Sequence, residues 1–208
     1  YAGDPCASLR LMEASAQHFE EAGDLRTACQ QWGNVGFLKR ELGLYQECET
    51  ALRGVLDMAL RLGLDHIVPT ARHNLGPALA AQGRLAEARA LEEEAVAVFE
   101  RQGDRRFEGA SRVYLSRILL AGGDSVGAER QATTAVEVLD AVPQARAVAL
   151  AAVATALLRQ GRTQAAVARA EEALELLEQV GGADEGETEI RLVVAEARHA
   201  AGDRDGAA

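Results

Sequence analysis

The chain has 208 residues, of which 48% are hydrophobic, 26% charged and 4% aromatic, and its formal net charge at pH 7 is −10. This acidic balance disfavours nucleic acid and anionic membrane surfaces as partners, because both attract Lys and Arg. No apolar run reaches the ~18 residues that a membrane span needs, and three unevenly spaced cysteines predict no disulfide framework. We therefore expect a cytoplasmic protein with a folded core, packed from Ala, Leu and Val.

Glycines recur along the chain at steps of about 40 residues. The first series is Gly3, Gly43, Gly83, Gly123, Gly161 and Gly202, and the second, halfway between, is Gly23, Gly63, Gly103 and Gly181, with Pro143 in the remaining place. Several of these glycines precede an aspartate. Gly is the usual left-handed residue after a helix, and Asp caps a helix start, so each glycine predicts the end of one helix and the beginning of the next.

The segments between the glycines have helical periodicity, as Leu75, Ala78 and Leu79 illustrate, and strand signals are absent. The sequence therefore predicts an all-α fold. The expected helices span residues 6–22, 25–42, 45–62, 66–82, 85–102, 105–121, 124–141, 144–160, 163–180 and 186–201.

Small residues stand at fixed distances from the first glycine series. Gly36, Gly76, Ser116 and Ala154 precede it by the same spacing, and Cys48, Ala88, Ala128 and Ala166 follow it by another. Close helix crossings require small side chains. The pattern therefore predicts one antiparallel helical hairpin repeated along the chain.

These residues carry a resemblance to the tetratricopeptide repeat: Trp32, Val35-Gly36, Gly43, Cys48, Leu52 and Val55 in one unit, then Leu75-Gly76, Gly83, Ala88 and Ala95 in the next. The longer repeat is similar to those of kinesin light chain, maltose-type bacterial activators and regulatory kinases. The resemblance implies a right-handed superhelical solenoid of antiparallel helix pairs. Arginines replace the aromatic at the position of Trp32, and Glu92 stands at the position of Leu52. A register shift of one residue would explain the glutamate.

We expect residues 1–208 to form a single solenoid, excised from a longer protein. It would consist of a half unit at 4–22, full units at 25–62, 66–102, 105–141 and 144–180, and a partial unit at 185–208. Because neither end resembles the polar cap of a repeat array, contact with attached domains and oligomerisation through the ends stay open.

In this family the first helix of each pair lines the concave groove. The expected groove residues are Gln30, Asn34, Phe37, Arg40, His73, Asn74, Tyr114, Arg117 and Arg159. The first helices carry net positive charge and the second helices net negative charge, which favours an acidic or C-terminal carboxylate segment in the groove; the alternative is segregation for packing and solubility. Asn34 and Asn74 are equivalent, and their amides can pair with a peptide backbone or remain solvated.

Catalytic residues, cofactors and a metal site are not indicated. We expect His66 and His73 at the surface, Glu92 on the outer face, Cys29 and Cys48 buried, Trp32 packed inside its hairpin, and a helix kink at Pro77. The chain is expected to be a non-catalytic interaction module that binds a protein or peptide segment. It would be the regulatory part of a larger bacterial signalling protein, such as a Ser/Thr kinase or an ATPase regulator. The alternative is a superhelix that senses a small effector and controls an attached ATPase, kinase or transcription unit.

Overall fold

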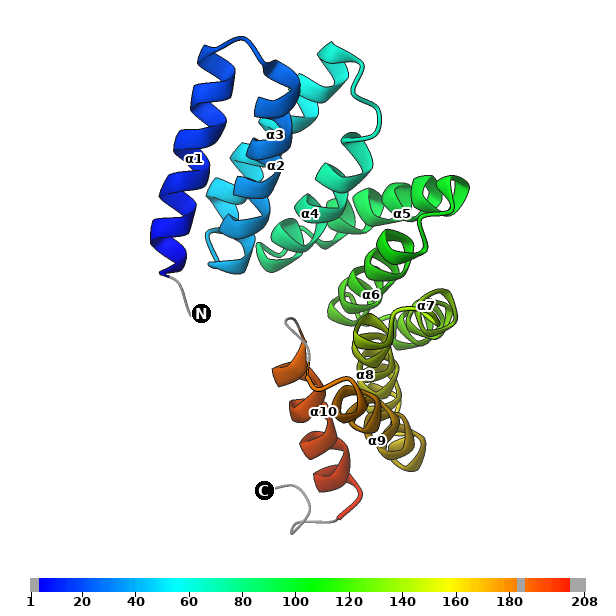
Figure 1. The fold of residues 1–208 in the computed structure, drawn as a ribbon. Helices are drawn as coiled ribbons and strands as arrows, with labels where there is room; N and C mark the ends of the chain where they lie inside the picture. The colour runs from blue at the N-terminus through cyan, green and yellow to red at the C-terminus, as the bar shows by residue number, and fades with distance from the viewer. Residues whose placement is uncertain (1–3, 183–185, 203–208) are drawn as a thin grey trace. The chain divides into compact units, whose positions relative to one another are not determined.

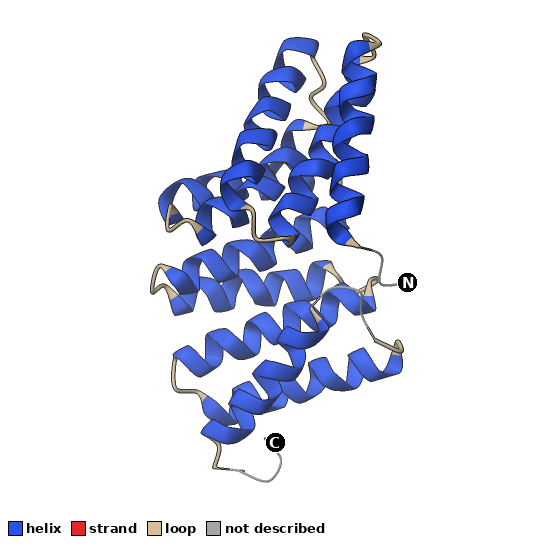
Figure 2. Ribbon diagram, turned by 90° about the vertical axis from the view of Figure 1, so that its left-hand side faces the viewer, coloured by secondary structure: helices blue, strands red, loops and turns tan. Residues whose placement is uncertain are grey.

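The computed structural model describes residues 4–182 and 186–202, which form ten α-helices and no strand (Figure 1, Figure 2). The all-α prediction is confirmed, and each expected helix is present to within a few residues. The helices are α1 (Pro5–Glu21), α2 (Leu25–Glu41), α3 (Tyr45–Leu62), α4 (Val68–Ala81), α5 (Leu85–Gln102), α6 (Arg105–Ala121), α7 (Ser125–Val138), α8 (Pro143–Arg159), α9 (Thr163–Gln179) and α10 (Glu187–Ala200).

The helix ends follow the predicted chemistry. Gly63 after α3 has a φ of 65°, a left-handed conformation that a residue with a Cβ rarely adopts. Aspartates cap the starts of α2 and α6. The Asp24 side chain accepts a hydrogen bond from the backbone N–H of Thr27 at 3.2 Å, and the Asp104 side chain accepts one from the N–H of Phe107 at 3.1 Å. The predicted turn residues Gly3 and Asp203 lie outside the described residues. Pro77 lies inside α4, and the kink expected there stays a prediction.

In the α2–α3 hairpin the two helices approach so closely beside Leu52 that only glycine fits at the crossing. A Cβ on Gly36 of α2 would stand 2.5 Å from Leu52 of α3, a distance that real contacts do not reach. Ala88 and Ala128, at the other predicted crossing position, are completely buried. The small residues therefore mark close helix contacts, as the sequence indicates.

Two expectations about Glu92 differ from the structure. A Cβ on Gly76 of α4 would stand 2.7 Å from the Glu92 carboxylate, so Glu92 packs on Gly76 as Leu52 packs on Gly36. The repeat keeps its register, and a one-residue shift is wrong. Glu92 is also completely buried, so the outer-face prediction is wrong. The space above Gly76 accommodates the carboxylate inside the hairpin.

The chain divides into two compact units, Tyr1–Ala95 and Val96–Ala208. The core of the first unit includes Cys29, Val55 and Ala59, with Trp32 half-buried against them. Trp32 also donates from Nε1 to Glu20 of α1 at 3.1 Å, so its contacts extend beyond its own hairpin. The second unit packs the alanines of α8 between α7 and α9, where short side chains allow close contact.

Candidate functional site

A pocket of about 390 Å³ opens between α2, α3 and α4 in the first unit. Its polar lining consists of Gln30, Gln31 and Asn34 from α2, His66 from the α3–α4 connection, and Thr70 and Asn74 from α4. Val55, Ile67 and Ala71 supply the apolar part. A concave surface that presents several amide groups above an apolar floor is suited to holding a peptide segment in a defined orientation.

Asn34 and Asn74 occupy equivalent places on α2 and α4. Each directly precedes a fully buried residue, Val35 or Leu75, which is anchored inside its hairpin. Asn34 is exposed, whereas Asn74 is only 8% exposed, and both line the pocket. The pocket therefore presents two amides, one repeat apart, each able to donate and accept.

Phe37 and Arg40, also expected in the groove, are not among the residues that line this pocket. The Arg40 guanidinium lies 4.9 Å from the centre of the Phe37 ring and 2.7 Å from a carboxylate oxygen of Glu41. Arg40 is only 7% exposed. Its charge is therefore compensated within α2.

His73 is not at the surface, so that prediction is wrong. Its side chain is buried against α5, with Nδ1 3.4 Å from Oε2 of Glu92. A glutamate at a position where other repeats have an apolar residue needs a polar partner inside the hairpin. His73, one turn before Gly76, is this polar partner. The sequence signal for the pair was a histidine one turn before the crossing glycine together with a glutamate at the apolar position of the next helix. His66 is exposed, as predicted.

In the second unit the structure brings Tyr114 and Arg117 of α6 together. The Arg117 guanidinium lies 5.2 Å from the centre of the Tyr114 ring. Two nitrogens of the guanidinium donate to the carboxylate of Glu189 on α10: Nε donates to Oε1 at 3.1 Å, and Nη2 donates to Oε2. Arg159, at the end of α8, is exposed.

Several arginines of the first helices are paired with carboxylates of this chain. Nη1 of Arg72 lies 3.0 Å from Oε2 of Glu94, and Nη2 of Arg112 lies 2.8 Å from Oε1 of Glu108. For these arginines the contacts favour the packing interpretation of the charge pattern over a surface that awaits an acidic ligand.

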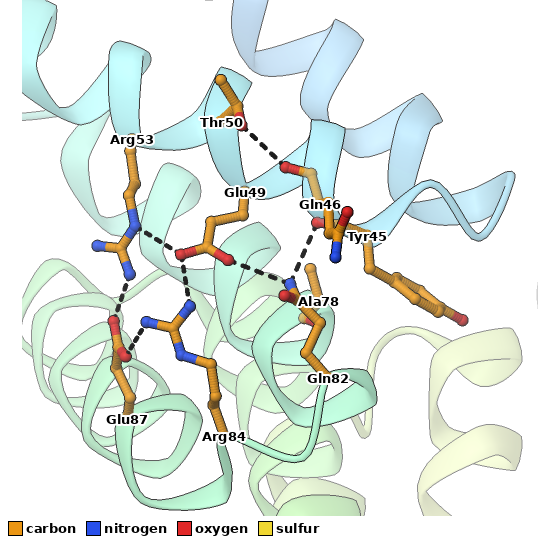
Figure 3. Close-up of polar contacts among 9 residues, drawn as sticks. All are labelled: Tyr45, Gln46, Glu49, Thr50, Arg53, Ala78, Gln82, Arg84 and Glu87. Carbon is orange, nitrogen blue, oxygen red and sulfur yellow. Dashed lines mark hydrogen bonds and ion pairs between the residues drawn. The ribbon is translucent and has the colours of Figure 1, made fainter.

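A polar cluster in the first unit connects α3 to the α4–α5 turn (Figure 3). Gln82 donates to the Tyr45 carbonyl at 3.3 Å and to Glu49 at 3.2 Å. Arg53 and Arg84 also bind Glu49, at 2.8 and 2.6 Å. These hydrogen bonds, that from Arg53 foremost, hold the pKa of Glu49 below its ordinary value. The cluster therefore links one hairpin to the next.

The second unit contains the same connection. Gln160 donates to the Ser125 carbonyl at 3.0 Å and to Glu129 at 2.9 Å, and Arg162 binds Glu129 at 2.8 Å. This connection between repeats was not predicted from the sequence. The available signal was the tripeptide Gln-Gly-Arg at 82–84 and 160–162, preceded by a glutamate in the previous repeat.

Two family models match parts of this chain. A family model described as tetratricopeptide repeat matches residues 27–101, and a second with the same description matches residues 146–184. Together the two matches cover more than half of the chain. No curated protein sequence matches it.

Solved structures share the fold at low sequence identity. BtubC (BKLC) from P. vanneervenii is 17% identical with a TM-score of 0.70, over 98% of this chain and 84% of that one. Repeats from Podosopora anserina described as kinesin light chain are 20% identical with a TM-score of 0.55, over 100% and 92%. A STAND protein with a tetratricopeptide repeat sensor from Pyrococcus horikoshii is 14% identical with a TM-score of 0.68, over 94% of this chain and 32% of that one.

These similarities show a repeat fold of the tetratricopeptide type. Among the described residues, no helix combines the length and the hydropathy that crossing a membrane requires.

Proposed function

The chain belongs to the tetratricopeptide repeat family, and from this premise we propose that it is a non-catalytic module that binds an extended segment of a partner protein. The observation that carries the proposal is the pocket lined by Asn34 and Asn74. Packed helices lie ~8–10 Å apart, and an extended peptide rises ~3.3 Å per residue. The two amides would thus meet peptide groups about three residues apart.

Main-chain recognition is the mode that this pocket supports best. A side-chain amide pairs with the N–H and C=O of a peptide unit whatever its side chain, so affinity comes from the backbone. Arg40 is bound to Glu41 and packed on Phe37, so we assign the polar anchoring in the first unit to the amides. Specificity would then come from side chains of the partner that contact the exposed residues of the pocket lining, such as Gln30 and His66.

The experiment is a screen of a random peptide library against the whole chain, followed by affinity measurement by fluorescence anisotropy. Replacing both amides, Asn34→Ala with Asn74→Ala, should weaken the selected peptide about tenfold, because each net hydrogen bond contributes ~0.5–1.5 kcal/mol. Gln46→Ala is the matched control, since Gln46 is exposed on α3 and does not line the pocket. Unchanged binding by the double variant, with unchanged circular dichroism, would refute the assignment.

A second candidate function is sensing of a small effector. The pocket volume of about 390 Å³ falls within the range of ~300–1,000 Å³ that small-molecule sites occupy. A thermal-shift screen with a metabolite library tests this alternative. It predicts a stabilising metabolite whose effect disappears in the Asn34, Asn74 double variant, together with no selected peptide.

We also propose that the repeats are the regulatory part of a larger bacterial signalling protein in the cytoplasm. The STAND protein, of which this chain covers 32%, supports the proposal because its repeats are described as a sensor within a longer chain. A nucleotide-binding or kinase motif elsewhere in the same reading frame would support this role, and a reading frame without a signalling domain would contradict it.

A further inference from the structure

One ion pair in the second unit joins two helices that are not neighbours. Arg117 belongs to α6 and Glu189 to α10, and each of these helices packs against α8 (Figure 1). The guanidinium donates from Nε to Oε1 at 3.1 Å and from Nη2 to Oε2. The two side chains therefore reach across α8, on a face where the groove residues of the second unit are expected.

The start of α10 also lies directly on that face. Gly186, the residue before α10, has a φ of 85°, and a Cβ added to it would stand 2.6 Å from a methyl group of Val148 on α8. Only glycine permits both this conformation and this close approach. Together Gly186 and Glu189 cover part of the surface that a segment running across α6 and α8 would use.

The contact between Arg117 and Glu189 can be opened without unfolding α10. The two side chains are 34% and 38% exposed, and ion pairs this exposed contribute little to folding stability. Ile190 and Val193 keep α10 packed in the core. Glu189 lies in the first turn, where the helix dipole stabilises a carboxylate even without Arg117.

The arginine is arranged to receive a carboxylate. Its planar guanidinium binds carboxylates through two parallel hydrogen bonds, which is the geometry that Glu189 adopts. The Tyr114 ring, 5.2 Å from the guanidinium, supports its position. We propose that Tyr114 and Arg117 form a carboxylate-binding site for an acidic segment of a partner protein, and that Glu189 fills this site until that segment displaces it.

This inference goes beyond the proposed function, because it concerns a different unit and does not depend on Asn34 or Asn74. The test uses the whole chain and a defined probe, the fluorescent peptide acetyl-(Gly-Glu)₄-amide, with acetyl-(Gly-Gln)₄-amide as the uncharged comparison. Glu189→Gln should bind the acidic peptide about tenfold more tightly than the wild type. That is the effect of removing an internal competitor that fills the site roughly nine-tenths of the time.

Two variants separate this site from a general charge effect. Glu187→Gln removes the same charge two residues earlier, where the carboxylate binds Arg191, and should leave affinity at the wild-type level. Adding Arg117→Gln to Glu189→Gln should abolish the gain. The proposal is overturned if Glu189→Gln binds no better than the wild type, if Glu187→Gln gains as much, or if the gain survives loss of Arg117. A lower melting temperature of Glu189→Gln without tighter binding would also overturn it, because the pair would then be only structural.

Discussion

Nδ1 of His73 lies 3.4 Å from Oε2 of Glu92, between α4 and α5, with both side chains almost completely buried. In the preceding hairpin the position of Glu92 belongs to Leu52, which packs on Gly36 with apolar atoms alone. The second hairpin therefore contains a polar pair where the first contains only hydrocarbon.

Removing one residue of the polar pair should lower the stability of the fold, whereas replacing both with apolar residues should not. His73→Leu takes a polar partner away from the buried Glu92 carboxylate, so it should lower the free energy of unfolding by about 3 kcal/mol. The double variant His73→Leu with Glu92→Leu should recover at least the wild-type value, because a well-packed apolar pair replaces the buried polar one at little or no cost. Urea unfolding followed by circular dichroism measures all three proteins. A double variant less stable than His73→Leu would contradict this account.

Gly36 should tolerate no larger residue while Leu52 is present. In Gly36→Ala the new methyl group would meet Leu52 at 2.5 Å, and overpacking of this kind costs about 1–3 kcal/mol. The last full hairpin shows the alternative solution, since Ala154 and Ala170 take the equivalent positions and are both fully buried.

The matching experiment repeats Gly36→Ala in a Leu52→Ala background. The substitution should cost less than half as much there, because the side chain that obstructs the methyl group has been shortened. Equal costs in the two backgrounds, measured by urea unfolding, would show that the crossing at Gly36 does not limit side-chain size.

The helices and their packing were predictable because they depend on local chemistry that recurs. A left-handed glycine such as Gly63, a capping aspartate such as Asp24 and a small crossing residue such as Ala88 each carry their meaning in the residue type and its spacing. The buried position of Glu92 was not recognised because a charged residue is normally exposed. Only the geometry of Gly76 shows that a carboxylate fits there.

The candidate site was predictable in part. Periodicity along α2 and α4 identifies Gln30, Asn34 and Asn74 as neighbours, and all three line one pocket. Which arginines form ion pairs with carboxylates of this chain was not predictable, because these pairs depend on contacts between distant segments. The pair between Arg117 and Glu189 joins residues 72 positions apart, beyond the reach of any local pattern.

The connection around Glu49 should make stability depend on pH. The pKa of Glu49 is lowered in the folded chain, first by the hydrogen bond from Arg53. The carboxylate therefore stabilises the fold above its unfolded pKa, near 4.5, and this contribution is lost as the pH falls through the lower folded value. Between pH 6 and about pH 3, the urea midpoint should fall further for the wild type than for Glu49→Gln.

Gln46→Ala provides the control for that measurement. Gln46 is exposed on the same helix and carries no ionisable group, so its substitution should leave the pH dependence of the wild type unchanged. Parallel curves for the wild type and Glu49→Gln would mean that the connection does not contribute to stability.

The three cysteines should differ sharply in reactivity. Burial raises the pKa of Cys48 to about 11 and also raises that of Cys29, whereas Cys6 is exposed. Since the thiolate is the reactive form, a disulfide reagent at pH 8 should modify one thiol in the native protein and all three in urea. Cys6→Ser should abolish the native reaction. Rapid modification of Cys48 in the native protein would contradict its place in the core.

The most direct test of main-chain recognition by Asn34 and Asn74 is a backbone N-methyl scan of the selected peptide, in which each N–H is replaced in turn. On the wild type, methylation at one or two positions should weaken binding about tenfold, whereas on the Asn34, Asn74 double alanine variant the same peptides should all bind alike. If methylation produced the same losses on both proteins, the two amides would not be the groups that contact the peptide backbone.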